Sequence, residues 1–153
     1  MTNKIITISR QFGSGGRTVG KLVAEKLGIP CYDSQIISQI AEKSGFAEEY
    51  IKENGEYMES TGFFASLGNV GYYGQSNQLT IWSEQCRIIK ELAEKGDCVI
   101  VGRCADYVLR DMPGVTNVFI YAEYEDRLKR AVEVYGDDEA KVKDIIATYD
   151  KAR

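Results

Sequence analysis

Hydrophobic residues along this chain of 153 residues fall into two kinds of pattern that alternate. Short, mainly apolar runs, typical of strands, lie at 5–9, 29–33, 98–101 and 116–122, and the first is rich in β-branched residues. Stretches with apolar residues every three or four positions, typical of helices, lie at 17–27, 36–44, 47–54, 77–95, 107–109, 123–134 and 137–153. Strands that alternate with helices are typical of a parallel sheet covered by helices. We therefore predict an α/β fold that forms one domain over residues 1–153.

Three segments refine this picture. The run 98–101 contains no charged or hydroxyl residue, which predicts a central strand buried on both faces. Residues 60–77 are rich in glycine and aromatic residues and have no clear period, which predicts a loop or insert acting as a lid or ligand-binding segment. The alternative for 60–77 is a surface excursion, or a contact in a homo-oligomer through its aromatic residues. The chain ends inside the last predicted helix, so we expect a C-terminal strand and helix to be missing.

Composition narrows the classes of partner and of chemistry. The net charge of −4 argues against nucleic acid or an anionic membrane as a partner, because both attract basic surfaces. No apolar run approaches the roughly 20 residues of a membrane span. The four cysteines have no CxxC spacing, which favours reduced thiols in a cytoplasmic protein. The chain has no histidine, and the remaining carboxylates, cations and backbone amides suit phosphoryl transfer.

A glycine-rich loop follows the first predicted strand and leads into a helix. The order strand, loop, helix presents backbone N–H groups and the positive end of the helix dipole to one point, which binds phosphate. The phosphate-binding pattern GxxxxGK(S/T) is present here in altered form, with Arg10 at its first glycine and Gly16 at its lysine. Thr18 can supply the hydroxyl that holds Mg²⁺, and Arg17 or Lys21 can supply the charge. The alternative is a glycine turn without a ligand.

Further candidates follow two other predicted strands, where ligands of parallel sheets bind. Asp33 and Ser34 lie at the C-terminal end of the second strand and can contact a ligand or cap the next helix. Arg103 follows the run 98–101 and can clamp a phosphate with both arms of its guanidinium, the alternative being a structural ion pair. Asp106, one turn later, can orient Arg103 or act on the substrate or a metal.

Several of these stretches resemble the cytidylate kinase-like family, P-loop proteins related to bacterial cytidylate kinases. The matching stretches, in family order, are 6–17, 32–33, 99–106, 126–127 and 150–153. The resemblance implies a three-layer fold of the P-loop NTPase type, with a central parallel sheet flanked by helices, a helical lid and an acceptor-binding region. It also implies ATP and Mg²⁺ as cofactors, and CMP or dCMP as the small-molecule substrate of a kinase.

The resemblance also implies roles for individual residues. ATP would be bound by Gly13, Ser14, Gly15, Gly16, Arg17 and Thr18, and Mg²⁺ by Thr18. The acceptor would be contacted by Asp33, Ser34, Arg103, Asp150 and Arg153, with Asp106 beside them. Arg17 and Arg103 are the candidate catalytic cations, together with the lid arginines Arg127 and Arg130.

The missing lysine keeps two other functions open. The first is a module that binds nucleotide or phosphate without kinase activity. The second is a kinase of another small molecule, which the unusual segment 60–77 would recognise. Taken without the resemblance, the charges of the last two predicted helices are also typical of an exposed, solvated surface.

Overall fold

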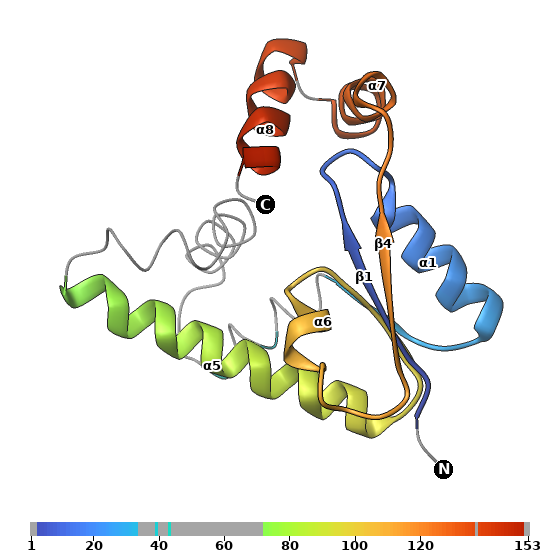
Figure 1. Cartoon of the computed structure of the whole chain (residues 1–153), viewed down its shortest axis with the longest axis vertical. Coiled ribbons are helices and arrows are strands. Elements are labelled where there is room, and N and C mark those ends of the chain that lie inside the picture. Colours follow the sequence, from blue (N-terminus) through green and yellow to red (C-terminus); the bar gives the residue numbers. More distant parts are fainter. Residues whose placement is uncertain (1–2, 34–38, 40–42, 44–71, 137, 152–153) are drawn as a thin grey trace.

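The computed structural model of the chain describes residues 3–33, 39, 43, 72–136 and 138–151 (Figure 1). The elements formed by these residues are, in chain order, β1 (Ile5–Arg10), α1 (Gly16–Leu27), β2 (Cys31–Tyr32), α5 (Tyr72–Lys95), β3 (Cys98–Val101), α6 (Ala105–Val108), β4 (Val115–Ile120), α7 (Tyr124–Tyr135) and α8 (Glu139–Lys151). None of the described helices is long and apolar enough to cross a membrane.

The four described strands form one parallel sheet in the order β2-β3-β1-β4. Ile5 at the start of β1 lies opposite both Cys98 of β3 and Val115 of β4. All four residues of β3 are buried, as expected for a strand covered on both faces. The predicted parallel α/β sheet, with the apolar run 98–101 as a central strand, is therefore confirmed.

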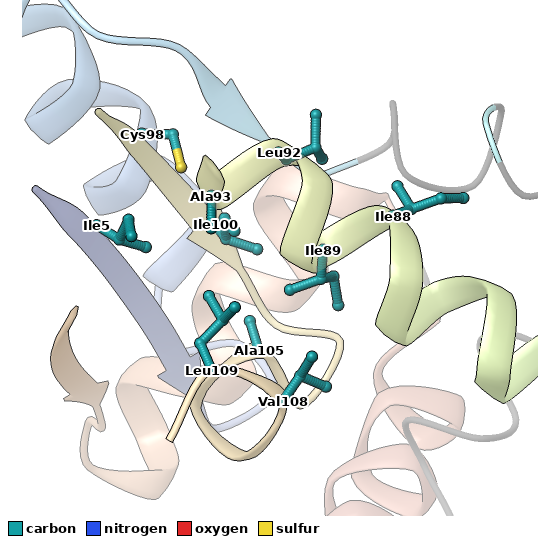
Figure 2. Packing of buried hydrophobic residues seen from close by; sticks show 10 residues of the cluster. All are labelled: Ile5, Ile88, Ile89, Leu92, Ala93, Cys98, Ile100, Ala105, Val108 and Leu109. Carbon is teal, nitrogen blue, oxygen red and sulfur yellow. The ribbon is translucent and has the colours of Figure 1, made fainter. Parts of the chain in front are cut away.

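Helices cover both faces of the sheet because the side chains of β3 alternate between them. Val99 and Val101 pack with Ala24 of α1 on one face. Cys98 and Ile100 pack on the other face with α5 and α6, in the apolar cluster drawn in Figure 2. The sheet with a helical layer on each face makes the three-layer fold that the resemblance implied.

Close packing brings α1 directly onto β3. A Cβ atom added at Gly20 would lie 2.6 Å from Cγ2 of Val101, so any larger residue at this position would force the helix away from the strand. The glycine therefore sets the distance between α1 and the sheet, and with it the position of the loop that precedes α1.

Two element boundaries differ from the prediction. Helix α5 begins at Tyr72 instead of 77, so the prediction of a loop is wrong for residues 72–77. Extending a helix that is already formed is cheap, and it does not need the apolar period that we used to find its start. The second strand covers Cys31–Tyr32 alone, because Pro30 has no N–H for a sheet ladder. Residues 60–71 and the helix predicted at 47–54 lie outside the described residues.

Helices α7 and α8 lie beyond the end of the sheet at which β1 and β4 finish (Figure 1). They pack through their own small cluster of Leu128, Ala131, Val142 and Ile146, against which Phe12 of the glycine-rich loop also packs. The pair of helices is therefore attached to the loop, and it brings distant residues to that loop.

Candidate functional site

The loop between β1 and α1 is held to the end of β4 by hydrogen bonds. The N–H of Gln11 donates to the carbonyl of Ile120 at 3.0 Å, and Oγ of Ser14 donates to the same carbonyl at 3.2 Å. Gly15 is the N-cap of α1 and has left-handed geometry, with φ of 86°. Because glycine has no side chain to accept from the first-turn N–H groups, these donors and the positive helix end face any anion in the loop.

Helix α7 presses against this loop at two glycines. A Cβ atom at Gly13 would lie 2.5 Å from the carbonyl oxygen of Arg127, and one at Gly15 would lie 2.9 Å from Cζ of Arg130. Both glycines also have positive φ, which disfavours other residues. The loop therefore needs glycine for its backbone and for the close approach of α7.

Arg130 lies over the start of α1. Its Nη2 donates to Oγ1 of Thr18 at 3.1 Å, and its guanidinium covers Gly15. A cation beside the positive end of a helix is electrostatically unfavourable until an anion joins it. The Thr18 hydroxyl keeps a donor and a second acceptor site for another ligand. The arrangement thus suits a phosphate between Arg130 and the loop.

Arg127, three residues before Arg130, has a different environment. Its side chain is buried, its Nε donates to the carbonyl of Phe12 at 2.8 Å, and its two terminal nitrogens donate to the two oxygens of Asp150 at 2.8 and 3.0 Å. The rings of Phe12 and Tyr149 lie 5.2 Å apart beside this contact. The structure therefore brings the predicted site residues Arg127 and Asp150 together as a bidentate ion pair that joins the loop, α7 and α8.

Arg17 also binds a carboxylate instead of lying over the loop. Its Nε is 2.5 Å from Oδ2 of Asp33, at the end of β2. The Asp33 side chain is only 13% exposed. The ion pair therefore holds the Arg17 guanidinium beside Asp33, a residue predicted to contact the acceptor. Ser34 and Arg153, two further predicted acceptor contacts, lie outside the described residues.

Arg10 approaches the loop from the end of β1. A Cβ atom added at Gly16 would lie 2.6 Å from Cβ of Arg10 and 2.9 Å from its Cδ. The side chain of Arg10 thus covers the position at which the phosphate-binding pattern has its lysine. We did not identify Arg10 as a site residue from the sequence, although its own departure from the pattern was a signal.

Arg103 lies in a strained turn after β3. Gly102, Arg103 and Cys104 all have positive φ, at 74°, 58° and 51°. This conformation is uncommon for residues other than glycine, and it is often retained at functional sites. Arg103 is buried, and Nε2 of the buried Gln85 donates to its carbonyl at 3.1 Å. The predicted Asp106 is half-buried in the first turn of α6.

A cavity of about 360 Å³ opens between the loop and α7. Its charged lining consists of Asp126, Lys129, Arg130 and Glu133, with Gly13 and Ser14 on the loop side. Of these four α7 residues, only Arg130 was predicted as a site residue. The spacing 126, 129, 130, 133 places all four on one helix face, and this spacing could have indicated the other three. Among the described residues, no group of three or more Cys, Asp or Glu side chains forms a metal site.

Comparison with known proteins gives a consistent result. The model of a family described as the cytidylate kinase-like family matches residues 5–153. A cytidylate kinase from Archaeoglobus fulgidus is 30% identical over 135 residues, which are 87% of this chain and 63% of that protein. The chain thus spans less than two thirds of the length of that relative.

Solved structures with a similar fold include three examples. An uncharacterized protein from Eubacterium ventriosum has 29% identity and a TM-score of 0.66, over 97% of this chain and 71% of that one. A protein from Thermus thermophilus has 18% identity and a TM-score of 0.63, over 100% and 81%. Shikimate kinase from Acinetobacter baumannii, in complex with shikimate, has 17% identity and a TM-score of 0.51, over 99% and 78%. At the identities of the last two, the likeness concerns the fold alone.

Proposed function

The chain belongs to the cytidylate kinase-like family, as its motifs predicted, and we propose that it transfers the γ-phosphoryl group of ATP to a nucleoside monophosphate. CMP or dCMP is the proposed acceptor, by analogy with the Archaeoglobus fulgidus relative. The observation that carries the proposal is Arg130, whose guanidinium lies over Gly15 and binds Thr18 at the N-terminus of α1. That arrangement supplies a cation at a loop that has no lysine.

The donor phosphates would bind the backbone N–H groups of the loop and the guanidinium of Arg130. Two positive groups face each other there, the helix end and the arginine, and a phosphate between them would relieve their repulsion. The Thr18 hydroxyl would hold Mg²⁺, which typically takes few protein ligands and completes its shell with phosphate oxygens and water. When bound, Mg²⁺ supplies further neutralisation of phosphate charge.

The reaction needs little covalent chemistry from the protein. An oxygen of the acceptor monophosphate would attack the γ-phosphorus, the bond to the bridging oxygen of ADP would break, and charge would spread over the transferred group. Arg130 would stabilise that charge. Arg103 and the Arg17–Asp33 pair would orient the acceptor. A phosphate nucleophile is already ionised at neutral pH, so no histidine is required.

Arg127 and Asp150 are proposed to act together as a structural pair. The resemblance implied that Arg127 acts on the transferred phosphoryl group and that Asp150 contacts the acceptor. Since both side chains are occupied by each other, we propose that Arg127 positions α7 so that Arg130 reaches the loop. The acceptor contacts of Ser34 and Arg153 remain predictions from the resemblance. A cytoplasmic location and a homo-oligomer remain predictions from the cysteine pattern and from the aromatic residues of 60–77.

A coupled assay for ADP release tests the proposal. The wild-type chain would be assayed with ATP and, in turn, CMP, dCMP, UMP, AMP and non-nucleotide acceptors such as shikimate. Arg130→Met is expected to lower kcat at least about 100-fold, because it removes charge stabilisation from the transition state. Lys143→Met, which removes an α8 cation paired with Glu139, is the matched control and should retain activity.

The main rival function is a nucleotide-binding module without kinase activity, favoured by glycine at position 16. A thermal shift with ATP but no turnover of any acceptor would select this rival and contradict the kinase proposal. Turnover of a non-nucleotide acceptor alone would keep the phosphotransferase and change its substrate class.

A further inference from the structure

Two departures from the phosphate-binding pattern touch each other in the folded chain. Arg10 stands where the pattern has its first glycine, and Gly16 stands where it has its lysine. A Cβ atom built on Gly16 would lie 2.6 Å from Cβ, 2.9 Å from Cδ and 3.1 Å from Cγ of Arg10. Carbon atoms in favourable contact are about 3.5–4.0 Å apart. A side chain at position 16 is therefore incompatible with Arg10 in its present conformation.

The fold explains why these two positions meet. Strand β1 ends at Arg10 and α1 begins at Gly16, so the loop between them folds back on itself. Gly16 is buried although it is the first residue of α1, because the aliphatic carbons of Arg10 cover it. The guanidinium follows directly after Cδ, and it therefore starts beside the first turn of α1.

We propose that the two departures are one exchange, in which Arg10 supplies from the strand end the cation that the standard pattern supplies from position 16. Gly16 makes room for the arginine, and the guanidinium binds the donor phosphates together with Arg130 from α7. The guanidinium presents a planar fork to two phosphate oxygens, whereas lysine presents a point charge. This catalytic role of Arg10 rests on the proposed kinase function; the exchange itself rests on packing alone.

The packing half of the exchange is tested without nucleotide. Urea unfolding would compare the wild-type chain with Arg10→Gly, Gly16→Lys and the double variant Arg10→Gly/Gly16→Lys. Gly16→Lys alone should lose much of the stability or fail to fold, because its side chain meets Arg10. The double variant, which has the standard pattern at both positions, should be more stable than Gly16→Lys. If the double variant is no more stable than Gly16→Lys, the exchange is overturned.

The charge half is tested by calorimetric titration with ATP and Mg²⁺ and with inorganic tripolyphosphate. Arg10→Met keeps an unbranched chain over Gly16 but loses the charge. Its affinity for both probes should fall about 10- to 100-fold, the usual worth of a charge-assisted hydrogen bond. Lys26→Met, which removes an exposed cation from the last turn of α1, is the matched control and should bind as the wild type does. The double variant should regain at least half of the lost binding free energy.

The outcomes separate this inference from the proposed function. If Arg10→Met binds ATP and turns over as the wild type does, the role of Arg10 is wrong and the kinase proposal stands. If the wild-type chain binds ATP without turning over any acceptor, and Arg10→Met loses affinity, the kinase proposal is wrong and the role of Arg10 in phosphate binding stands.

Discussion

The sheet and the helical pair beyond its end, α7 with α8, are held together by different forces. The larger core cluster, on the face covered by α5 and α6, is apolar, with Ile88, Ile89 and Ile100 fully buried. We call α7 and α8 the helical cap. It has a smaller cluster, and it adds a buried arginine bound to Asp150 and to the loop carbonyl of Phe12. Apolar packing thus holds the sheet and its helices, while the cap that carries Arg130 is held by a polar contact as well.

The largest expected effect comes from truncating the same residue type in each region. Ile100 in the sheet and Ile146 in the cap are both almost completely buried. Ile100→Ala should lower the free energy of unfolding by about 2–5 kcal/mol, since it opens a cavity in a close-packed core. Ile146→Ala should cost less globally and should instead speed hydrogen exchange in α8. Equal losses in urea unfolding, with no local change in exchange, would show that sheet and cap form one cooperative unit.

The polar contact of the cap should give the next largest effect. Asp150→Ala leaves the buried Arg127 guanidinium without its carboxylate, and should cost about 1–3 kcal/mol, reduced because Asp150 is 40% exposed. Asp150→Asn keeps one acceptor and should cost less. Amide hydrogen exchange in α7 and α8 measures the loss of local stability in both variants. If the amides of both variants are as well protected as in the wild type, the apolar cluster alone holds the cap.

A change of pH tests the burial of the Cys98 thiol in the sheet. Burial, with smaller contributions from Asp97 and Cys31, raises the pKa of the Cys98 thiol from 9.0 to about 11. The folded chain therefore disfavours the thiolate, so this contribution to stability is complete below pH 9 and is lost as pH rises towards 11. The loss at pH 10 should be about 1 kcal/mol. Urea unfolding of the wild-type chain and of Cys98→Ala at pH 8 and pH 10 isolates the contribution of this thiol. If both proteins lose the same stability between the two pH values, the loss does not come from Cys98.

The smallest expected effect concerns the strained turn after β3. Cys104 is exposed and has φ of 51°, which costs about 1–2 kcal/mol in a residue other than glycine. Cys104→Gly removes this strain but adds freedom to the unfolded chain, so stability should rise by less than about 1 kcal/mol. Ala140→Gly, at an exposed position in the first turn of α8, should lower stability instead. A loss of stability in both variants would show that the turn stores no strain.

Much of the fold was predictable because its signals are local. Short apolar runs located the strands of the sheet, and the apolar period located α1, α7 and α8 to within two residues. The start of α5 was not predictable from the apolar period, since the clear helical spacing of apolar residues in the sequence begins only at 77. The sequence placed candidate site residues in the glycine-rich loop and at Asp33 and Arg103, because each lies at or just after the C-terminal end of a predicted strand; their roles stay predictions.

The sequence by itself determined that strands alternate with helices in a parallel α/β sheet, and it placed a glycine-rich loop after the first strand, where we propose that a phosphate binds. Only the tertiary structure decided which cation meets which group. Arg127 binds the carbonyl of Phe12, and Arg130 binds Thr18, across sequence separations of 115 and 112 residues. Arg17 binds Asp33, and Arg10 covers Gly16. The reason is physical: periodicity reports which face a residue occupies on its own element, whereas the partner of an arginine depends on how helices and strands pack together.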